Sequence, residues 1–103
     1  MEFSKKQIDY ICDTIKDLNM STTFRNYNIN LMSLEKNKAY IIIDSLTREL
    51  EIDITLSLET NGVCFKTSNN HITRYNYDVA RTNRSIWWFQ VITKEIVTSV
   101  LNT

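Results

Sequence analysis

The sequence predicts an α+β fold, a two-layer sandwich in which an N-terminal helix, a four-stranded antiparallel meander and a C-terminal helix follow one another. Apolar residues recur at helical spacing near both ends of the chain. Between these segments, apolar and polar residues alternate over several short stretches, which is the pattern of half-buried strands. A length of 103 residues is typical of one domain, so we expect a single compact unit over residues 1–103.

The N-terminal helix is expected from about Lys5 to Leu18. Ser4 followed by Gln7 has the spacing of a capping box, in which each side chain accepts a bond from the backbone N–H of the other residue. An apolar stripe follows at intervals of three and four residues: Ile8, Ile11, Cys12, Ile15 and Leu18. Charged residues occupy the other side, so this helix is expected to bury one face only.

Alternation defines the four strands of the meander. The first two are expected over residues 27–31 and 40–43. The third alternates without a break over residues 49–59, with apolar side chains on one face and mainly acidic side chains on the other. Asn61-Gly62 is typical of a type I′ hairpin turn, and the fourth strand returns after it.

The C-terminal third of the chain leaves two alternatives open. Residues 72–77 are compatible with a short strand or with an ordered loop. Residues 86–93 are β-branched or aromatic, which favours a strand, whereas the helical period that continues to Leu101 favours a helix. We adopt the helix, with Ser85 as its cap. Its inward-facing residues are then Ile86, Phe89, Ile92, Ile96 and Val100.

Composition excludes several classes of protein. An apolar fraction of 43% and a charged fraction of 23% exclude a disordered chain. A single glycine excludes glycine-rich phosphate loops and nucleophile elbows, because both need several glycines. No apolar run approaches the length of a membrane span, and the N-terminus lacks an apolar signal core. We therefore expect a cytoplasmic protein with no membrane association.

The sequence contains no constellation typical of catalysis or of metal binding. Cys12 and Cys64 are far apart and belong to no metal-binding motif, so both are expected as small buried residues in a reducing compartment. His71 is the only histidine, and its polar neighbours are typical of an exposed loop. No Ser or Cys nucleophile adjoins it. We expect no catalytic residue, no metal and no cofactor, and hence no enzymatic activity.

Charge is segregated along the chain, although the formal net charge is zero. Residues 33–62 contain three basic and six acidic residues, whereas residues 63–103 contain five basic and two acidic ones. Three carboxylates, those of Glu49, Glu51 and Asp53, stand two residues apart on the polar side of the third strand. We interpret them as a solvated face or as the site of a basic partner. Acid–base catalysis is disfavoured, because it needs burial that separates pKa values.

Arginines and aromatic residues alternate in residues 74–94, and they form a second candidate partner site. The residues selected are Arg74, Tyr77, Arg81, Arg84 and Trp87. Trp88 and Phe89 are expected in the core, and Trp87 outside it, because one helix cannot bury the whole run from Ile86 to Phe89 on one side. Tyr, Trp and Arg are typical of protein interfaces, but the same residue types also clamp phosphates and stack on bases. An ordinary mixture of core and surface is the third interpretation.

These observations favour a small, non-enzymatic protein-binding module. The short chain, with 13 Ile, 11 Asn and 7 Lys, has the composition of inhibitors that phages or mobile elements encode against a host protein or a nucleic-acid-handling defence complex. Two alternatives remain. One is a nucleic-acid-binding protein that uses the cluster of residues 74–94. The other is a homodimeric structural subunit that pairs through the C-terminal helix.

Overall fold

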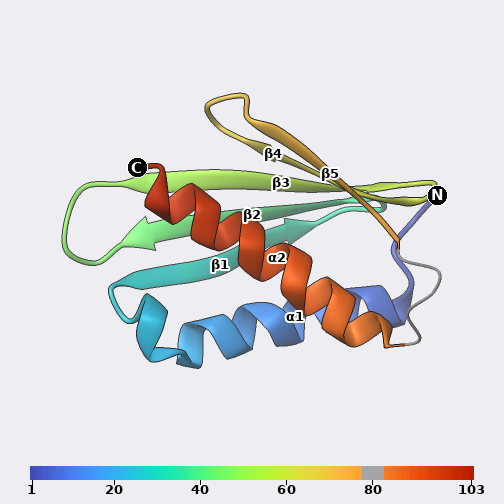
Figure 1. Cartoon of the computed structure of the whole chain (residues 1–103), viewed down its shortest axis with the longest axis horizontal. Helices are drawn as coiled ribbons and strands as arrows, with labels where there is room; N and C mark the ends of the chain where they lie inside the picture. The colour runs from blue at the N-terminus through green and yellow to red at the C-terminus, as the bar shows by residue number, and fades with distance from the viewer. Residues whose placement is uncertain (78–82) are drawn as a thin grey trace.

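The computed structural model describes residues 1–77 and 83–103, in the α+β order that the sequence predicts (Figure 1). The fold class is confirmed, but the sheet has five strands in place of four, because residues 72–76 pair with the preceding strand. The elements in chain order are α1 (Lys5–Met20), the 3-10 helix η1 (Thr22–Phe24), β1 (Tyr27–Leu34), β2 (Lys38–Ser45), β3 (Glu51–Glu59), β4 (Gly62–Thr67), β5 (Ile72–Asn76) and α2 (Arg84–Leu101).

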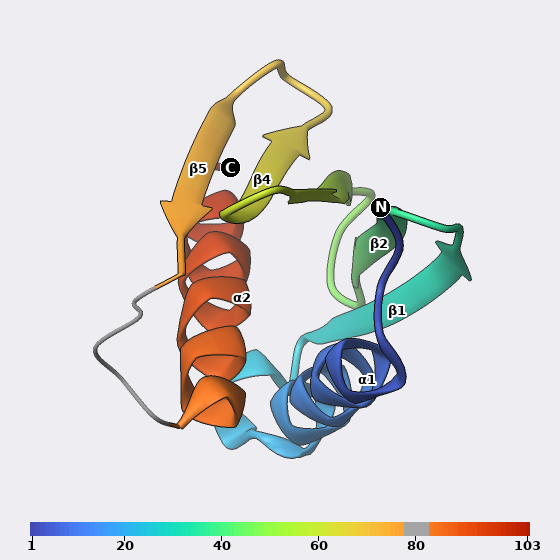
Figure 2. The ribbon, with the colours of Figure 1, turned by 90° about the vertical axis from the view of Figure 1, so that its right-hand side faces the viewer.

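The five strands form one antiparallel sheet in the order β1-β2-β3-β4-β5. Figure 2 shows the sheet curling around α1 and α2, which lie on the same side of it. The other face, called the outer face below, is covered by no helix of the described chain. The alternation predicted for β3 is confirmed over Glu51–Glu59, because its apolar side chains are buried whereas Glu51 and Asp53 are exposed.

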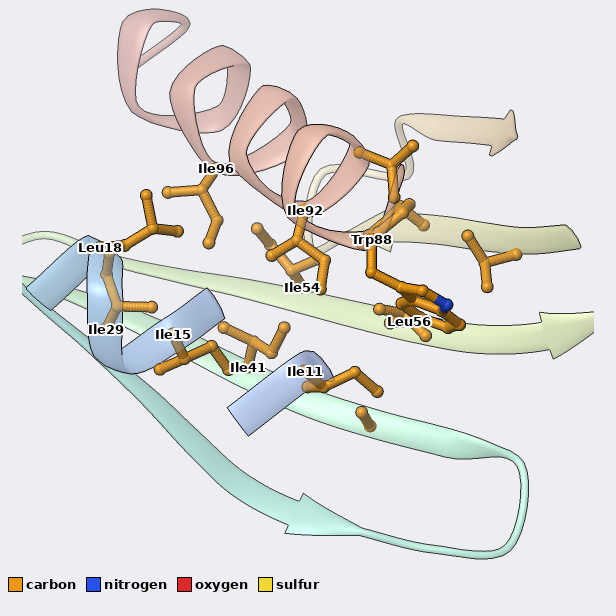
Figure 3. Close-up of a cluster of buried hydrophobic side chains, with 14 of the residues drawn as sticks. Ile11, Ile15, Leu18, Ile29, Ile41, Ile54, Leu56, Trp88, Ile92 and Ile96 are labelled. Carbon is orange, nitrogen blue, oxygen red and sulfur yellow. The ribbon is translucent and has the colours of Figure 1, made fainter. Parts of the chain in front are cut away.

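The hydrophobic core lies between the helices and the inner face of the sheet (Figure 3). Helix α1 contributes its apolar stripe, α2 contributes one large indole, and the central strands contribute alternate residues. Its most deeply buried side chains include Ile11, Ile29, Ile41, Ile54, Leu56, Trp88, Ile92 and Ile96. Apolar burial of this kind supplies the main favourable contribution to folding.

Helix α1 begins as predicted and differs at one position of its buried stripe. Ser4 Oγ accepts from the backbone N–H of Gln7, and Gln7 Oε1 accepts from that of Ser4, which confirms the capping box. The prediction that Cys12 is buried is wrong: its side chain is exposed. Thr14 is buried in its place, and its hydroxyl donates to the Tyr10 carbonyl at 2.7 Å, so the inward turn of a polar residue leaves no unpaired group.

Helix α2 is confirmed over the segment for which a strand was the alternative, but its cap and its inner face differ from prediction. Asn83 caps it, with Oδ1 accepting from the N–H of Ile86 and from the Ser85 hydroxyl. Ile86 and Phe89, predicted inside, are 49% and 40% exposed. Ile92, Ile96 and Trp88 are buried as predicted, and Val91, Glu95 and Ser99 are buried beside them. The helix is rotated because the indole of Trp88 and the carboxylate of Glu95 both find partners inside.

The β3–β4 turn corrects the prediction made for Asn61-Gly62. Glu59 pairs directly with Gly62, so Thr60 and Asn61 form the turn, and Gly62 is the first residue of β4. Gly62 does not have the positive φ of a type I′ turn. A Cβ at this position would instead overlap the backbone carbonyl of Tyr75 on β5. The glycine is therefore required for the close approach of β5.

Candidate functional site

The outer face of the sheet carries three carboxylates at one end. Asp44 of β2 lies directly opposite Glu51 of β3, and Asp53 follows Glu51 on the same face. Glu49, predicted on this strand, lies in the turn before it and is exposed. It is therefore not counted with the other three, and we call Asp44, Glu51 and Asp53 the acidic patch.

The sequence analysis did not predict that Asp44 belongs to this patch. It stands in a β-branched run whose neighbours gave no sign of charge, and only the pairing of β2 with β3 brings it opposite Glu51. The pairing of residues 40–43 with residues 49–59 can be predicted by placing their apolar residues on the same face. That register would have placed Asp44 beside the carboxylates of the third strand.

The acidic patch costs the sheet stability. Like charges directly opposite one another on neighbouring strands repel, by a few tenths to about 1 kcal/mol. Within residues 1–77 and 83–103 the one ion pair joins Arg74 to Glu59, at 3.4 Å, on β5 and β3 and away from the patch. Both side chains of that pair are largely in water, so its contribution to stability is small. Among the described residues, no ion pair therefore offsets the repulsion between the carboxylates of the patch.

Two apolar side chains of β2 border the patch on the outer face. Ile42 lies directly opposite Asp53, and Tyr40 lies opposite Thr55 on β3. Both are half-buried although no helix covers them. The outer face thus combines an acidic end with a partly apolar centre.

The structure divides the predicted cluster of arginines and aromatic residues. Arg74 lies on the outer face, where its neighbour on β4 is Cys64 and its ion-pair partner is Glu59. Tyr77, Arg84 and Trp87 lie on the helix side, at the first turn of α2. Arg81 falls outside the described residues.

Tyr77 and Trp87 are engaged in packing. Their ring centroids are 4.8 Å apart, and the ring of Trp88 lies 5.4 Å from that of Trp87. The Gln7 amide donates to the Tyr77 hydroxyl at 3.2 Å, which ties α1 to this aromatic group. Burial raises the pKa of Tyr77, and the nearby Arg84 guanidinium opposes the rise. Trp87 lies outside the buried core, as predicted, but its indole is half-buried against this group and not freely exposed.

A buried carboxylate lies under β5. Glu95 of α2 is 3% exposed, and its Oε1 accepts from the Tyr75 hydroxyl at 2.7 Å. Burial and the hydrogen bond to Glu95 raise the pKa of Tyr75, because both favour the neutral hydroxyl. The Lys94 ammonium lies 5.8 Å from the centre of the same ring. These contacts fasten the edge strand β5 to α2, and they suit a structural role.

His71 is exposed, as predicted, and lines a polar pocket of 160 Å³ between the β4–β5 turn and the end of α2. Its backbone N–H donates to Thr67 Oγ1 at 3.2 Å. In the part of the chain that the structure describes, its imidazole makes no hydrogen bond. Nor does any group of three His, Cys, Asp or Glu side chains lie close enough there to hold a metal ion.

The two cysteines are free thiols, Cys12 exposed and Cys64 half-buried. Partial burial raises the pKa of the Cys12 thiol, and the carboxylates of Asp13 and Asp9 raise it further. A raised pKa lowers the thiolate fraction at neutral pH, which makes this cysteine a poor nucleophile.

Among residues 1–77 and 83–103, no helix has both the length and the apolar character needed to cross a membrane.

A groove lies between α1 and α2. Its volume is 320 Å³, and its apolar walls are Tyr10 of α1 with the exposed Ile86 and Phe89 of α2. Asp13 and Asp17, which lie on α1 like Tyr10, also line the groove. An exposed apolar group of this kind is typical of surfaces that contact another protein.

Comparison of the chain with known protein families, with curated proteins and with solved structures finds no match.

Proposed function

We propose that this chain is a small protein-binding module that docks its acidic patch on a basic surface of a partner protein. The observation that carries the proposal is the direct opposition of Asp44 and Glu51 on an uncovered sheet face. Such a pair destabilises the free sheet. A basic partner relieves the repulsion, so that binding recovers free energy that folding loses.

The charge and the apolar residues of the outer face also support the proposal. The acidic patch attracts a positively charged surface over a distance, which raises the rate of encounter. Next to it, Ile42 and Tyr40 provide apolar surface for the contact itself. Charge gives selectivity to an interface, whereas apolar and aromatic side chains give most of its affinity.

The proposal includes a more specific form, an inhibitor encoded by a phage or another mobile element. Proteins that handle nucleic acids display basic surfaces, and a small acidic module that covers such a surface blocks it. The short chain and its Ile, Asn and Lys content support this origin. The free thiols of Cys12 and Cys64 support the cytoplasm as the place of action. No catalytic step is assigned to the chain.

Nucleic-acid binding through the arginine cluster has less support. Arg74 lies on the outer face and pairs with Glu59, whereas Arg84 lies on the helix side. A backbone of phosphates needs cations along one continuous track, with aromatic rings free to stack on bases. The rings of Tyr77 and Trp87 instead pack against one another at a tilt of 52°.

The test is affinity capture from a lysate of the source cells, treated with nuclease. The bait is compared with the double charge reversal Glu51→Lys/Asp53→Lys. A matched control, Glu2→Lys/Glu35→Lys, makes the same change in net charge at exposed positions outside the acidic patch. Circular dichroism of the three chains verifies that each is folded.

We expect the wild type and the control to retain the same stoichiometric protein after nuclease treatment, and the patch variant to lose it. Binding of the purified partner then weakens as salt screens the patch. The proposal is overturned if the patch variant retains the partner, or if nuclease removes every captured protein.

A further inference from the structure

The groove between α1 and α2 continues into a second hollow. The 320 Å³ groove and a neighbouring pocket of 100 Å³ share Tyr10 as a common wall. Lys6 of α1 and Arg84 of α2 line the smaller pocket, whereas Asp13 and Asp17 line the larger groove. The combined surface is therefore basic at one end and acidic at the other.

Helix geometry explains this order of charge. Lys6, Tyr10, Asp13 and Asp17 follow at intervals of four, three and four residues, so that their side chains form one stripe along α1. With a rise of about 1.5 Å per residue, the stripe runs about 16 Å from its basic to its acidic end. Tyr10 lies between the charges.

Helix α2 supplies the rest of the surface. Arg84 adds a second cation at the basic end, beside Lys6. Ile86 and Phe89 add exposed apolar area beside Tyr10, although sequence periodicity places both of them inside. The apolar centre and the two charged ends together form what we call the helix-pair surface (Lys6, Tyr10, Asp13, Asp17, Arg84, Ile86 and Phe89).

We infer that a second copy of this chain occupies the helix-pair surface, related to the first by a two-fold axis that passes near Tyr10 and Phe89. A two-fold axis through the centre reverses the order of charge in the partner. Lys6 and Arg84 of one copy then face Asp13 and Asp17 of the other, and each of these contacts occurs twice. The apolar side chains meet at the axis and leave water.

Charge order selects this occupant because the surface is complementary to itself in the antiparallel arrangement alone. A parallel arrangement would place acid against acid and base against base, which costs binding free energy. The dimer also leaves the acidic patch free, because the patch lies on the outer face of the sheet and the helix-pair surface on the opposite side. This inference therefore does not depend on the proposed function.

Light scattering and sedimentation of the purified chain across the micromolar range test the inference. Two variants reverse one end each: Asp13→Lys/Asp17→Lys makes both ends basic, and Lys6→Glu/Arg84→Glu makes both ends acidic. The control, Lys5→Glu/Lys16→Glu, reverses two exposed charges on the side of α1 that faces away from the stripe.

We expect the wild type and the control to reach twice the chain mass of 12.2 kDa at moderate ionic strength. Each end-reversed variant alone stays at the monomer mass, because its two copies repel. An equimolar mixture of the two variants returns to the dimer mass, since basic ends then face acidic ends on both sides of the axis.

A wild-type chain that stays monomeric across this range overturns the inference. So does a mixture of the two variants that shows no more association than either variant alone. Loss of the dimer in the control also contradicts it, because association would then depend on total charge and not on the helix-pair surface. Circular dichroism excludes unfolding as the cause in each case.

Discussion

Helices α1 and α2 pack on the same face of the sheet, yet they divide polar and apolar residues differently. The buried side of α1 consists of Ile11, Ile15, Leu18 and one threonine, whose hydroxyl donates to a backbone carbonyl of the same helix. Helix α2 buries the carboxylate of Glu95 and leaves Phe89 in water. The difference shows that the buried side of α1 consists mainly of apolar core residues, whereas that of α2 also holds the edge strand β5 through Glu95.

The largest effect is expected from the side chain that anchors α2. Trp88 is 1% exposed and packs against Phe3, at a ring distance of 6.4 Å, and against Trp87. Trp88→Ala should lower the free energy of unfolding by about 3–5 kcal/mol, since it removes a buried indole and leaves a cavity. Urea unfolding followed by circular dichroism measures this loss. A loss below about 1 kcal/mol would show that α2 is held mainly by other contacts.

The next effect isolates the buried carboxylate of α2, which has no counterpart on the buried side of α1. Tyr75→Phe removes the hydroxyl that donates to Glu95, which leaves a buried carboxylate without this donor. We expect a loss of about 1–3 kcal/mol in the free energy of unfolding. The double variant Tyr75→Phe/Glu95→Leu should recover part of it, because the unpaired group is then gone. Equal losses in the single and double variants would contradict the role given to this bond.

The same hydroxyl predicts a dependence on alkaline pH. Burial and the bond to Glu95 raise the pKa of Tyr75 above its ordinary value of 10.0, so the folded state keeps a proton that the unfolded state releases. The contribution is complete below pH 10 and declines as the pH rises above it. Urea unfolding between pH 8 and 11 should therefore show a steeper decline for the wild type than for Tyr75→Phe. Parallel curves would argue against it.

Sequence periodicity predicted α1 and β3 well because each has one solvent-exposed face and one buried face. The charges of α1 and the acidic residues of β3 mark the solvent side clearly, and the capping box marks where α1 begins. In α2, apolar residues occupy more than one side, so the period fixes a helix but not its rotation. Trp88 and Glu95 decide the rotation through contacts with Phe3 and Tyr75, which lie far away in sequence.

The candidate surfaces were predictable to a different degree. Glu51 and Asp53 lie on the outer face as the alternation requires, but Asp44 joins them only through the register of β2 and β3. The arginine cluster was divided because β5 turns Arg74 to the outer face while Tyr75 points to the helices. Gly62 was assigned to a turn, although its role is to admit the backbone of Tyr75. Each of these depends on pairing between strands, which local pattern does not specify.

Helix α1 also makes a polar contact with an edge strand, and a smaller effect is expected there. The Asn19 side chain bonds both backbone groups of Ile29, donating to its C=O at 2.7 Å and accepting from its N–H at 2.9 Å. It thereby takes the place of a neighbouring strand at the edge β1. Asn19→Ala should cost about 1–2 kcal/mol, the value of two such bonds, in urea unfolding. It should also expose Ile29 to amide exchange, and an unchanged exchange rate would count against this account.

The smallest effect on stability is expected where α2 departs most from α1. Ile86→Gln/Phe89→Gln changes two exposed side chains, so the free energy of unfolding of the monomer should fall by less than about 1 kcal/mol. The same change at Ile11, which is 0% exposed, should prevent stable folding. If Ile86 and Phe89 lie at a two-fold axis, the wild-type melting temperature rises with protein concentration, because association stabilises the folded state. In the Gln variant that dependence should disappear while the monomer remains folded. A large loss of monomer stability would instead show that these residues belong to the core, and that the two helices differ less than their exposure indicates.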